Sequence, residues 1–218
     1  MNAAYDTVVI DVDGTLLDSN YHHTLAWARA FEHVGVTVPL WRIHRHIGMG
    51  GDMLVPAVAG DAVADEHGEA VQDRWEKEAD QLIEETRLLP GAKELLAALQ
   101  ERGLKVALAS SSIPKHAEYA AKLLDADRLA DVATTAEDAD EAKPDPELID
   151  VALDRVDGTR ACMVGDSVWD VQAANKRQLP TIGVLTGGYG RQELLDAGAR
   201  AVYADLEDLL AHLDDAFG

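Results

Sequence analysis

The chain of 218 residues carries 40 acidic and 19 basic side chains, which gives a formal net charge of −21 at pH 7. This charge disfavours nucleic acid as a partner, because binding to a phosphate backbone needs a positive surface. The length suits one domain, or one domain with a smaller insert, and we expect no membrane span because no apolar run approaches the required length. The N-terminal MNAAYDTVVI lacks the pattern of a signal peptide, so we expect a cytoplasmic protein.

Short apolar runs alternate with helical patterns along most of the chain. The runs predict buried strands over residues 7–11, 105–110, 131–134, 161–165, 181–185 and 201–203. Apolar residues at helical spacing predict helices over 90–101, 113–124, 146–156, 170–177, 191–197 and 206–216. This alternation indicates an α/β fold, a Rossmann-like doubly wound parallel sheet with helices on both faces.

One block interrupts the alternation directly after the first strand. Residues 19–87 contain no convincing strand and predict helices over 22–33, 40–47, 51–58 and 64–86, with GMGG at 48–51 as a turn or hinge. We therefore predict a small α-helical cap domain over 18–87, inserted into an α/β core domain over 1–17 and 88–218. Trp41 and Trp75 are expected in the apolar core of the cap.

The one cysteine, Cys162, lies in the apolar stretch ACMVGD. A lone cysteine excludes an intrachain disulfide. Because unpaired cysteine behaves as a small apolar residue, we expect Cys162 to be buried in the core.

Polar side chains follow four of the predicted strands. They are Asp11 and Asp13 after the first strand, Ser110, Ser111 and Ser112 after the second, Lys143 in a loop after the third, and Asp166, Ser167 and Asp170 after the fourth. Because open parallel sheets bind ligands at the carboxyl ends of their strands, we expect these side chains to converge. Together they offer carboxylates for a hard cation, hydroxyl and N–H groups for an anion, and one ammonium group to balance charge.

This set fits phosphoryl transfer with Mg²⁺, a cation that prefers oxygen ligands. Asp11 and Asp166 can supply carboxylates, and Asp13 can add its backbone carbonyl. A bound cation would remove the repulsion between the paired aspartates. A carboxylate can also act as a nucleophile and form an aspartyl-phosphate, while a neighbouring acid protonates the leaving oxygen and later activates water.

Four segments in this order, DVDGT, ASS, KPDP and GDSVWD, resemble the motifs of the haloacid dehalogenase-like (HAD) hydrolase superfamily. The resemblance spans the chain and is similar to the branch with a small helical cap. That branch includes phosphoglycolate phosphatases, sugar-phosphate phosphatases and β-phosphoglucomutases. The resemblance implies a Mg²⁺-dependent phosphatase that hydrolyses a small phosphomonoester metabolite through an aspartyl-phosphate.

The resemblance also implies roles for the matching acids. Asp11 would be the nucleophile and a Mg²⁺ ligand, and Asp13 the general acid/base with its backbone carbonyl on Mg²⁺. Asp166 would bind Mg²⁺, and Asp170 would orient Lys143 or a metal-bound water. Helix capping is the alternative role for these aspartates, and it stays open most for Asp170.

A second group would bind the substrate phosphate. It contains Ser110, the backbone N–H of Ser111, and Lys143, which would pair with both the phosphate and Asp11. Thr15 is placed in this group and would also position Asp13. At least one of the three serines is expected to cap the following helix instead, and Lys143 taken alone would be a surface lysine.

The predicted cap concentrates cations in LWRIHRHIGMGG. Arg42, Arg45 and His46 are candidates for substrate specificity, because a positive patch would recruit an anionic substrate. A helix with solvated basic residues explains the same pattern equally well. His22 and His23, at the start of a predicted helix, are expected to be structural.

Two other functions stay open. Asp13 disfavours carbon–halogen cleavage, since the resemblance implies that dehalogenases lack an acid there. A β-phosphoglucomutase-type phosphomutase is the main alternative, for which Lys77 is the available cap lysine. A non-catalytic binding protein on the same fold is less favoured, because the residues of all four motifs are intact. The expected partner is a small phosphorylated metabolite, and the chain is expected to be a monomer or a homodimer.

Overall fold

The structure is a computed structural model that describes residues 5–218, and the chain divides into two compact units. The first, called the core unit below, contains residues 1–18 and 88–218, and the second, the helical unit, contains residues 19–87. The prediction about a signal peptide and the start of the predicted core domain fall partly on residues 1–4, which lie outside the described residues. Each unit is described by itself.

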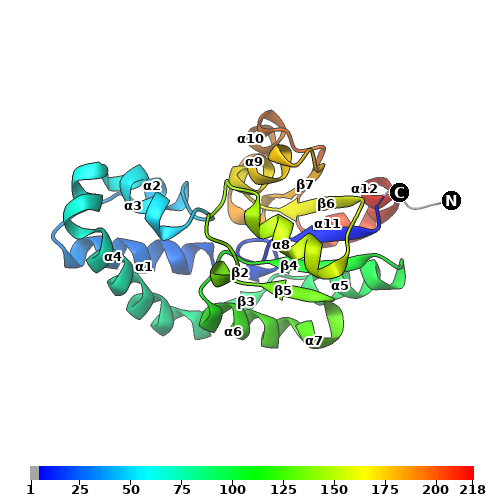
Figure 1. Ribbon diagram of the computed structural model, residues 1–218, viewed down its shortest axis with the longest axis horizontal. Helices are drawn as coiled ribbons and strands as arrows, with labels where there is room; N and C mark the ends of the chain where they lie inside the picture. The colour runs from blue at the N-terminus through cyan, green and yellow to red at the C-terminus, as the bar shows by residue number, and fades with distance from the viewer. Residues whose placement is uncertain (1–4) are drawn as a thin grey trace. The chain divides into compact units, whose positions relative to one another are not determined.

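The core unit is built on a parallel sheet of six strands among the described residues (Figure 1). The strands are β1 (Thr7–Ile10), β4 (Lys105–Ala109), β5 (Val132–Thr134), β6 (Ala161–Gly165), β7 (Thr181–Val184) and β8 (Ala201–Tyr203). Their spatial order is β5-β4-β1-β6-β7-β8, and every neighbouring pair is parallel. The predicted fold class is thereby confirmed, and each predicted strand lies within one residue of the observed bounds.

The connections run to opposite sides of β1. The chain passes from β1 to β4 and β5 on one side, and then to β6, β7 and β8 on the other. In register, Ile10 of β1 lies opposite both Leu108 of β4 and Val164 of β6. The direction of winding therefore reverses beside β1 and β6, which is where sheets of this kind bind ligands.

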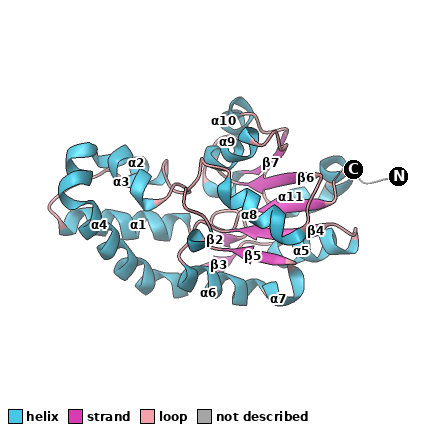
Figure 2. Cartoon of the chain, viewed as in Figure 1, coloured by secondary structure: helices cyan, strands magenta, loops and turns pink. Residues whose placement is uncertain are grey.

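Helices cover both faces of the sheet, which Figure 2 shows in magenta. They are α5 (Ala92–Glu101), α6 (Pro114–Leu124), α7 (Ala126–Leu129), α8 (Glu147–Val156), α9 (Val168–Lys176), α10 (Arg191–Ala197), α11 (Leu206–Ala211) and α12 (Leu213–Phe217). Val8 and Ile10 pack with α5, α6, α11 and α12, whereas Val9 packs with α8 and α9 on the other face. This alternation is the period-2 pattern of a strand that is buried on both sides.

Two helical details differ from prediction. The predicted helix over 206–216 is divided at His212, whose φ of −125° lies outside the helical range. The short α7 was not predicted, because four residues cannot show a helical period. Cys162 is fully buried, as expected, and burial raises the pKa of its thiol to about 12.

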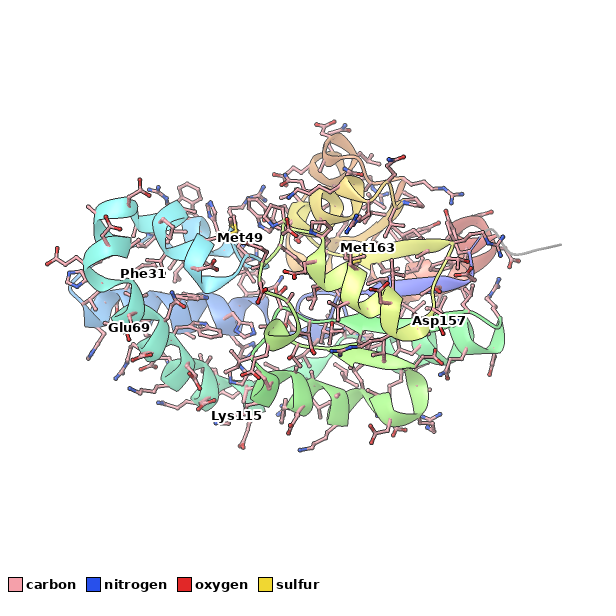
Figure 3. The ribbon with its side chains drawn as sticks, viewed as in Figure 1. Phe31, Met49, Glu69, Lys115, Asp157 and Met163 are labelled. Carbon is pink, nitrogen blue, oxygen red and sulfur yellow. The ribbon has the colours of Figure 1, made fainter. Side chains whose placement is uncertain are left out.

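The helical unit contains α1 (Asn20–His33), α2 (Leu40–His44), α3 (Gly51–Ala59), α4 (Asp61–Leu82) and the 3₁₀ turn η1 (Ile83–Glu85). Its apolar core includes Trp27, Phe31, Ile43 and Leu54, of which Phe31 is labelled in Figure 3. Trp75 stacks on Trp27 with ring centroids 5.0 Å apart, which confirms its expected place in this core.

The prediction for Trp41 was wrong, because its residue surface is 70% exposed. Helix α2 is a short helix that buries Ile43. Residues two positions apart point to different sides of a helix, so burying Ile43 leaves Trp41 outside. The same short helix ends at His44 rather than at the predicted residue 47.

The chain passes between the two units at β2 (Leu17–Asp18) and β3 (Arg87–Leu88), which form a separate two-stranded sheet. The N–H of Leu89 donates to the carbonyl of Leu16 at 2.9 Å beside this pair. Strands this short carry no sequence period, and they were not predicted. Among the described residues, no helix has both the length and the apolar character needed to cross a membrane.

Candidate active site

Three buried carboxylates meet at the carboxyl ends of β1 and β6. Asp11 follows β1, Asp166 follows β6, and Asp170 lies in the first turn of α9. One oxygen from each lies within 4.8 Å of the others. Like charges this close raise the energy of the site unless a cation balances them.

Lys143 brings a positive charge into this group. Its Nζ donates to Oδ1 of Asp11 and lies 2.8 Å from Oδ1 of Asp170. The lysine side chain is 2% exposed, so these carboxylates replace the water it has lost. The interpretation of Lys143 as a surface lysine is therefore wrong. Four of the predicted site residues lie together, namely Asp11, Lys143, Asp166 and Asp170.

The groups of this cluster shift one another's pKa values. Burial raises the pKa of Asp11 well above its usual value, and Asp170 and Asp166 add to that effect while Lys143 opposes it. Burial alone would lower the pKa of Lys143, but Asp11 and Asp170 outweigh burial and raise it. The raised pKa keeps Lys143 a cation, and its ammonium group pairs with Asp11 and Asp170.

Thr15 holds one of these carboxylates. Its Oγ1 donates to Oδ1 of Asp166 at 2.8 Å and lies 3.4 Å from Oδ2 of Asp11. That Thr15 also positions Asp13 stays a prediction. The chain turns tightly at Gly14, where φ is +80°, and this turn places Thr15 beside the end of β6.

Asp13 is held by a different residue, Ser112. The Ser112 hydroxyl donates to Oδ2 of Asp13 at 2.7 Å, and the Ser112 N–H donates to Oγ of Ser110 at 3.1 Å. Asp13 is half-buried, unlike the fully enclosed Asp11. The end of β4 and the end of β1 are therefore joined through one serine hydroxyl that the sequence analysis left without a role.

The three serines do not cap the next helix, which corrects the expectation that at least one would. The N-cap residue of α6 is Ile113, and no side chain among the described residues makes a capping hydrogen bond there. Pro114 is the first helical residue and has no N–H to satisfy, so the need for a cap is smaller. Ser110 is buried, and Oγ of Ser111 is buried without a hydrogen-bond partner within residues 5–218.

Asp170 combines the two roles proposed for it from sequence. Its Oδ2 accepts hydrogen bonds from the Ser167 N–H and hydroxyl, and its N–H donates back to the Ser167 hydroxyl. This is a capping box, which begins α9. The other oxygen, Oδ1, faces Lys143. The S-x-x-D spacing of residues 167–170 is the signal by which sequence reasoning could have assigned Ser167.

The candidate specificity residues belong to the helical unit. Arg42 Nη2 donates to the carbonyl of Ala57 at 3.4 Å, and Nδ1 of His46 lies 2.8 Å from the carbonyl oxygen of Arg42. Arg45 follows α2 as its C-cap residue. Their proposed contact with a substrate stays a prediction.

A fifth segment reaches the same edge of the sheet. Oγ1 of Thr186, two residues after the end of β7, donates to the carbonyl oxygen of Gly14 at 2.6 Å. Sequence reasoning examined the ends of four strands and passed over this one. The same rule, a polar residue soon after the end of a parallel strand, would have found it.

Known proteins share both the sequence pattern and the fold. Residues 5–176 match the haloacid dehalogenase-like hydrolase family. The phosphoglycolate phosphatase of Escherichia coli K12 is 29% identical, over 94% of this chain and 91% of its own length. The validoxylamine A 7′-phosphate phosphatase of Streptomyces hygroscopicus subsp. limoneus is 28% identical, over 84% and 86%.

Solved structures agree with this assignment. The crystal structure of a hydrolase from Pseudomonas syringae superposes with a TM-score of 0.89 at 34% identity, over 96% of this chain and 98% of that chain. A β-phosphoglucomutase from Clostridium difficile shares the fold, with a TM-score of 0.82 at 20% identity over 96% of each chain. The match to the family covers most of the chain, and the chain belongs to the haloacid dehalogenase-like hydrolase family.

Proposed function

We propose that the chain is a Mg²⁺-dependent phosphatase that hydrolyses a small phosphomonoester through an aspartyl-phosphate on Asp11. The observation that carries the proposal is the buried group of three carboxylates around one ammonium. Three carboxylates lie within reach of one another there, and Lys143 pairs with two of them, so the group is suited to take up a cation. Relatives named as phosphatases of phosphoglycolate and of validoxylamine A 7′-phosphate support the same activity.

The donor set suits Mg²⁺. Carboxylate oxygens of Asp11 and Asp166, with the backbone carbonyl of Asp13, would hold the cation, and Asp170 lies within the same group of oxygens. When bound, Mg²⁺ would supply the positive charge that stabilises the transferring phosphoryl group. Thr15 supports this site indirectly, through its hydrogen bond to Asp166.

Asp11 is the proposed nucleophile. Lys143 orients the carboxylate by donating to one of its oxygens and opposes the rise in its pKa, and a bound cation would further favour the charged form that attacks phosphorus. The new bond joins a carboxylate oxygen of Asp11 to phosphorus, and the bond from phosphorus to the leaving oxygen breaks. Lys143, the hydroxyl of Ser110 and the N–H of Ser111 would bind the phosphoryl oxygens during this step.

Asp13 is the proposed acid and base. It donates a proton to the leaving oxygen in the first step and takes a proton from water in the second. That water attacks phosphorus, phosphate departs, and the Asp11 carboxylate is restored. The hydrogen bond from Ser112 holds Asp13 while its partly exposed position leaves it open to a substrate.

We further propose that the helical unit is the cap that selects the substrate. Residues 19–60 contain three arginines and two acids, against a chain net charge of −21. Arg42, Arg45 and His46 lie in this less acidic stretch, which would favour an anionic leaving group. Phosphoglycolate-like and sugar-phosphate-like compounds are the proposed substrates.

The test is a phosphate-release screen over phosphorylated metabolites, with and without Mg²⁺. We expect Mg²⁺-dependent release from at least one compound, and loss of release by about three orders of magnitude or more in Asp11→Asn, because the nucleophile is gone. Asp214→Asn, which changes an exposed acid in the same way, is the matched control and should keep full activity.

Other outcomes would contradict the proposal. Retained turnover in Asp11→Asn would exclude the aspartyl-phosphate. Conversion of β-glucose 1-phosphate to glucose 6-phosphate with little release of phosphate would identify a phosphomutase. Binding of phosphorylated compounds without any turnover would identify a binding protein on this fold.

A further inference from the structure

The turn after β7 reaches the carboxylate group from a segment outside the four motifs. This turn is the 3₁₀ helix η3 (Leu185–Gly187), and it ends at Gly188, where φ is +86°. The hydroxyl of Thr186 in this turn donates to the Gly14 carbonyl at 2.6 Å. The turn is thereby tied to the loop that carries Asp13.

Gly187 lies against Asp166 so closely that no side chain fits. A Cβ on Gly187 would stand 1.6 Å from Oδ2 of Asp166 and 2.4 Å from its Cγ. Both separations are far shorter than a van der Waals contact, and Asp166 is itself buried with little room to retreat. Gly187 is absent from the glycines with positive φ, so close approach and not backbone freedom explains why glycine stands here.

Asp166 is therefore fixed from two sides. Thr15 donates to Oδ1, and the bare backbone of Gly187 lies beside Oδ2. A carboxylate with one oxygen bonded and the other against a backbone has little freedom to rotate. Groups that orient a metal ligand in this way set the affinity for the metal, although they never touch it.

We propose that Thr186 and Gly187 are positioning residues of the divalent-cation site. Gly187 sets the orientation of the Asp166 carboxylate by contact, and Thr186 sets the Asp13–Gly14 backbone through its hydrogen bond. The proposal rests on the proposed function only in that the carboxylate group binds a divalent cation. It assigns a fifth segment of the chain to a site that the four motifs leave incomplete.

The test measures binding of Mn²⁺ to the full metal-free chain by electron paramagnetic resonance. Mn²⁺ is used as the probe because it takes the same oxygen ligands as Mg²⁺. Gly187→Ala should weaken Mn²⁺ binding by about tenfold or more, as expected when the support of a metal ligand is displaced. Gly190→Ala is the matched control, because its Cβ would meet only the flexible Glu193 side chain, at 3.1 Å, and it should bind Mn²⁺ as the unchanged chain does.

Thr186 gives a second and gentler test. Thr186→Val keeps the shape of the side chain and removes the hydrogen bond to Gly14, so Mn²⁺ binding should weaken by several-fold. Thr186→Ser keeps the hydroxyl and should restore most of the affinity. Thermal unfolding of the metal-free variants is measured alongside, since a purely structural role would lower the unfolding temperature without changing Mn²⁺ affinity.

The outcomes separate this inference from the proposed function. Unchanged Mn²⁺ affinity in folded Gly187→Ala overturns the inference, even if the unchanged chain is a phosphatase. Weaker Mn²⁺ binding in that variant supports the inference, even if the unchanged chain releases no phosphate. If Gly187→Ala does not fold, the comparison of Thr186→Val with Thr186→Ser decides, and equal affinity in those two overturns the inference.

Discussion

Each unit of the molecule buries a carboxylate group, and the two groups differ in their balance of charge. In the helical unit, Glu78 on α4 is almost fully covered. Arg74 donates to its Oε1, and Nη1 of Arg29 on α1 donates to Oε2 at 3.3 Å. One carboxylate thus meets two guanidinium groups, and together they join α1 to α4.

The core unit shows the opposite balance. Asp11, Asp166 and Asp170 lie close together in a buried place, and one ammonium group, that of Lys143, pairs with Asp11 and Asp170. A fully paired buried acid such as Glu78 is explained by packing and hydrogen bonding within the fold. Three buried carboxylates in reach of one another are not explained in that way, because their mutual repulsion costs free energy that a bound cation would offset. The comparison indicates structure in the helical unit and a function in the core unit.

The largest expected effect comes from removing the cation of the core group. Lys143→Met leaves the buried carboxylates of Asp11 and Asp170 without their ammonium partner, which should cost about 3–5 kcal/mol of folding stability at neutral pH. Phosphate release should fall by about two orders of magnitude or more, because a charge that stabilises the transferring group is lost. Urea unfolding and a phosphate-release assay measure the two effects. Stability and turnover both near those of the unchanged chain would contradict the account.

The comparison is sharpest when one acid in each unit is made neutral. In the absence of metal, Asp166→Asn should raise the unfolding temperature, because it relieves repulsion among buried carboxylates. Glu78→Gln should lower it, because two arginines lose their partner, at a cost of about 1–3 kcal/mol. Activity should show the reverse order, lost in Asp166→Asn and kept in Glu78→Gln. Thermal unfolding with an activity assay tests both, and the same direction of change in the two unfolding temperatures would break the comparison.

The pH dependence of stability should also differ from that of an ordinary acid cluster. Burial raises the pKa of Asp11, so the metal-free folded chain holds a proton that the unfolded chain has already lost. Stability from this group is therefore full below the unfolded pKa of about 4 and falls as pH rises through the raised folded pKa. Urea unfolding measures the free energy of unfolding of the metal-free chain and of Asp11→Asn at several pH values across this window. This free energy should fall with rising pH in the unchanged chain, and the fall should be missing in Asp11→Asn.

The smallest effect is expected far from the site, at Asp6. Burial acts to raise the pKa of Asp6, but hydrogen bonds from Thr159 and from the N–H of Arg160 outweigh it and hold this pKa well below its usual value. Stability from Asp6 is therefore present above the unfolded pKa and is lost as pH falls through the folded pKa. Asp6→Asn should cost about 1–2 kcal/mol at neutral pH. Urea unfolding at pH 7 tests this, and an equal free energy of unfolding in Asp6→Asn and in the unchanged chain would contradict it.

The sequence predicted the sheet well because its strands are buried on both faces and bounded by turns. The same logic placed Asp11, Lys143 and Asp166 at one edge, since parallel strands end together. The sequence pattern did not predict which way individual side chains point within the site. Thr15 donates to Asp166 after a tight turn at Gly14, a geometry that spacing alone does not reveal.

Other misses have the same physical origin. Ser112, which follows β4, donates a hydrogen bond to Asp13, which follows the neighbouring strand β1 and is distant in sequence. The exposure of Trp41 depends on which side of a one-turn helix is buried. The close approach of Gly187 to Asp166 is set by the tertiary fold, and the sequence shows it only as one of several glycines.

The most direct test of the central claim is the effect of Mg²⁺ on thermal unfolding of three proteins. If the core group lacks a divalent cation, Mg²⁺ should raise the unfolding temperature of the unchanged chain and of Glu78→Gln, and should leave Asp166→Asn almost unchanged, because only the folded site binds the cation. An unfolding temperature that does not respond to millimolar Mg²⁺ in the unchanged chain, or that responds equally in Asp166→Asn, would contradict the account.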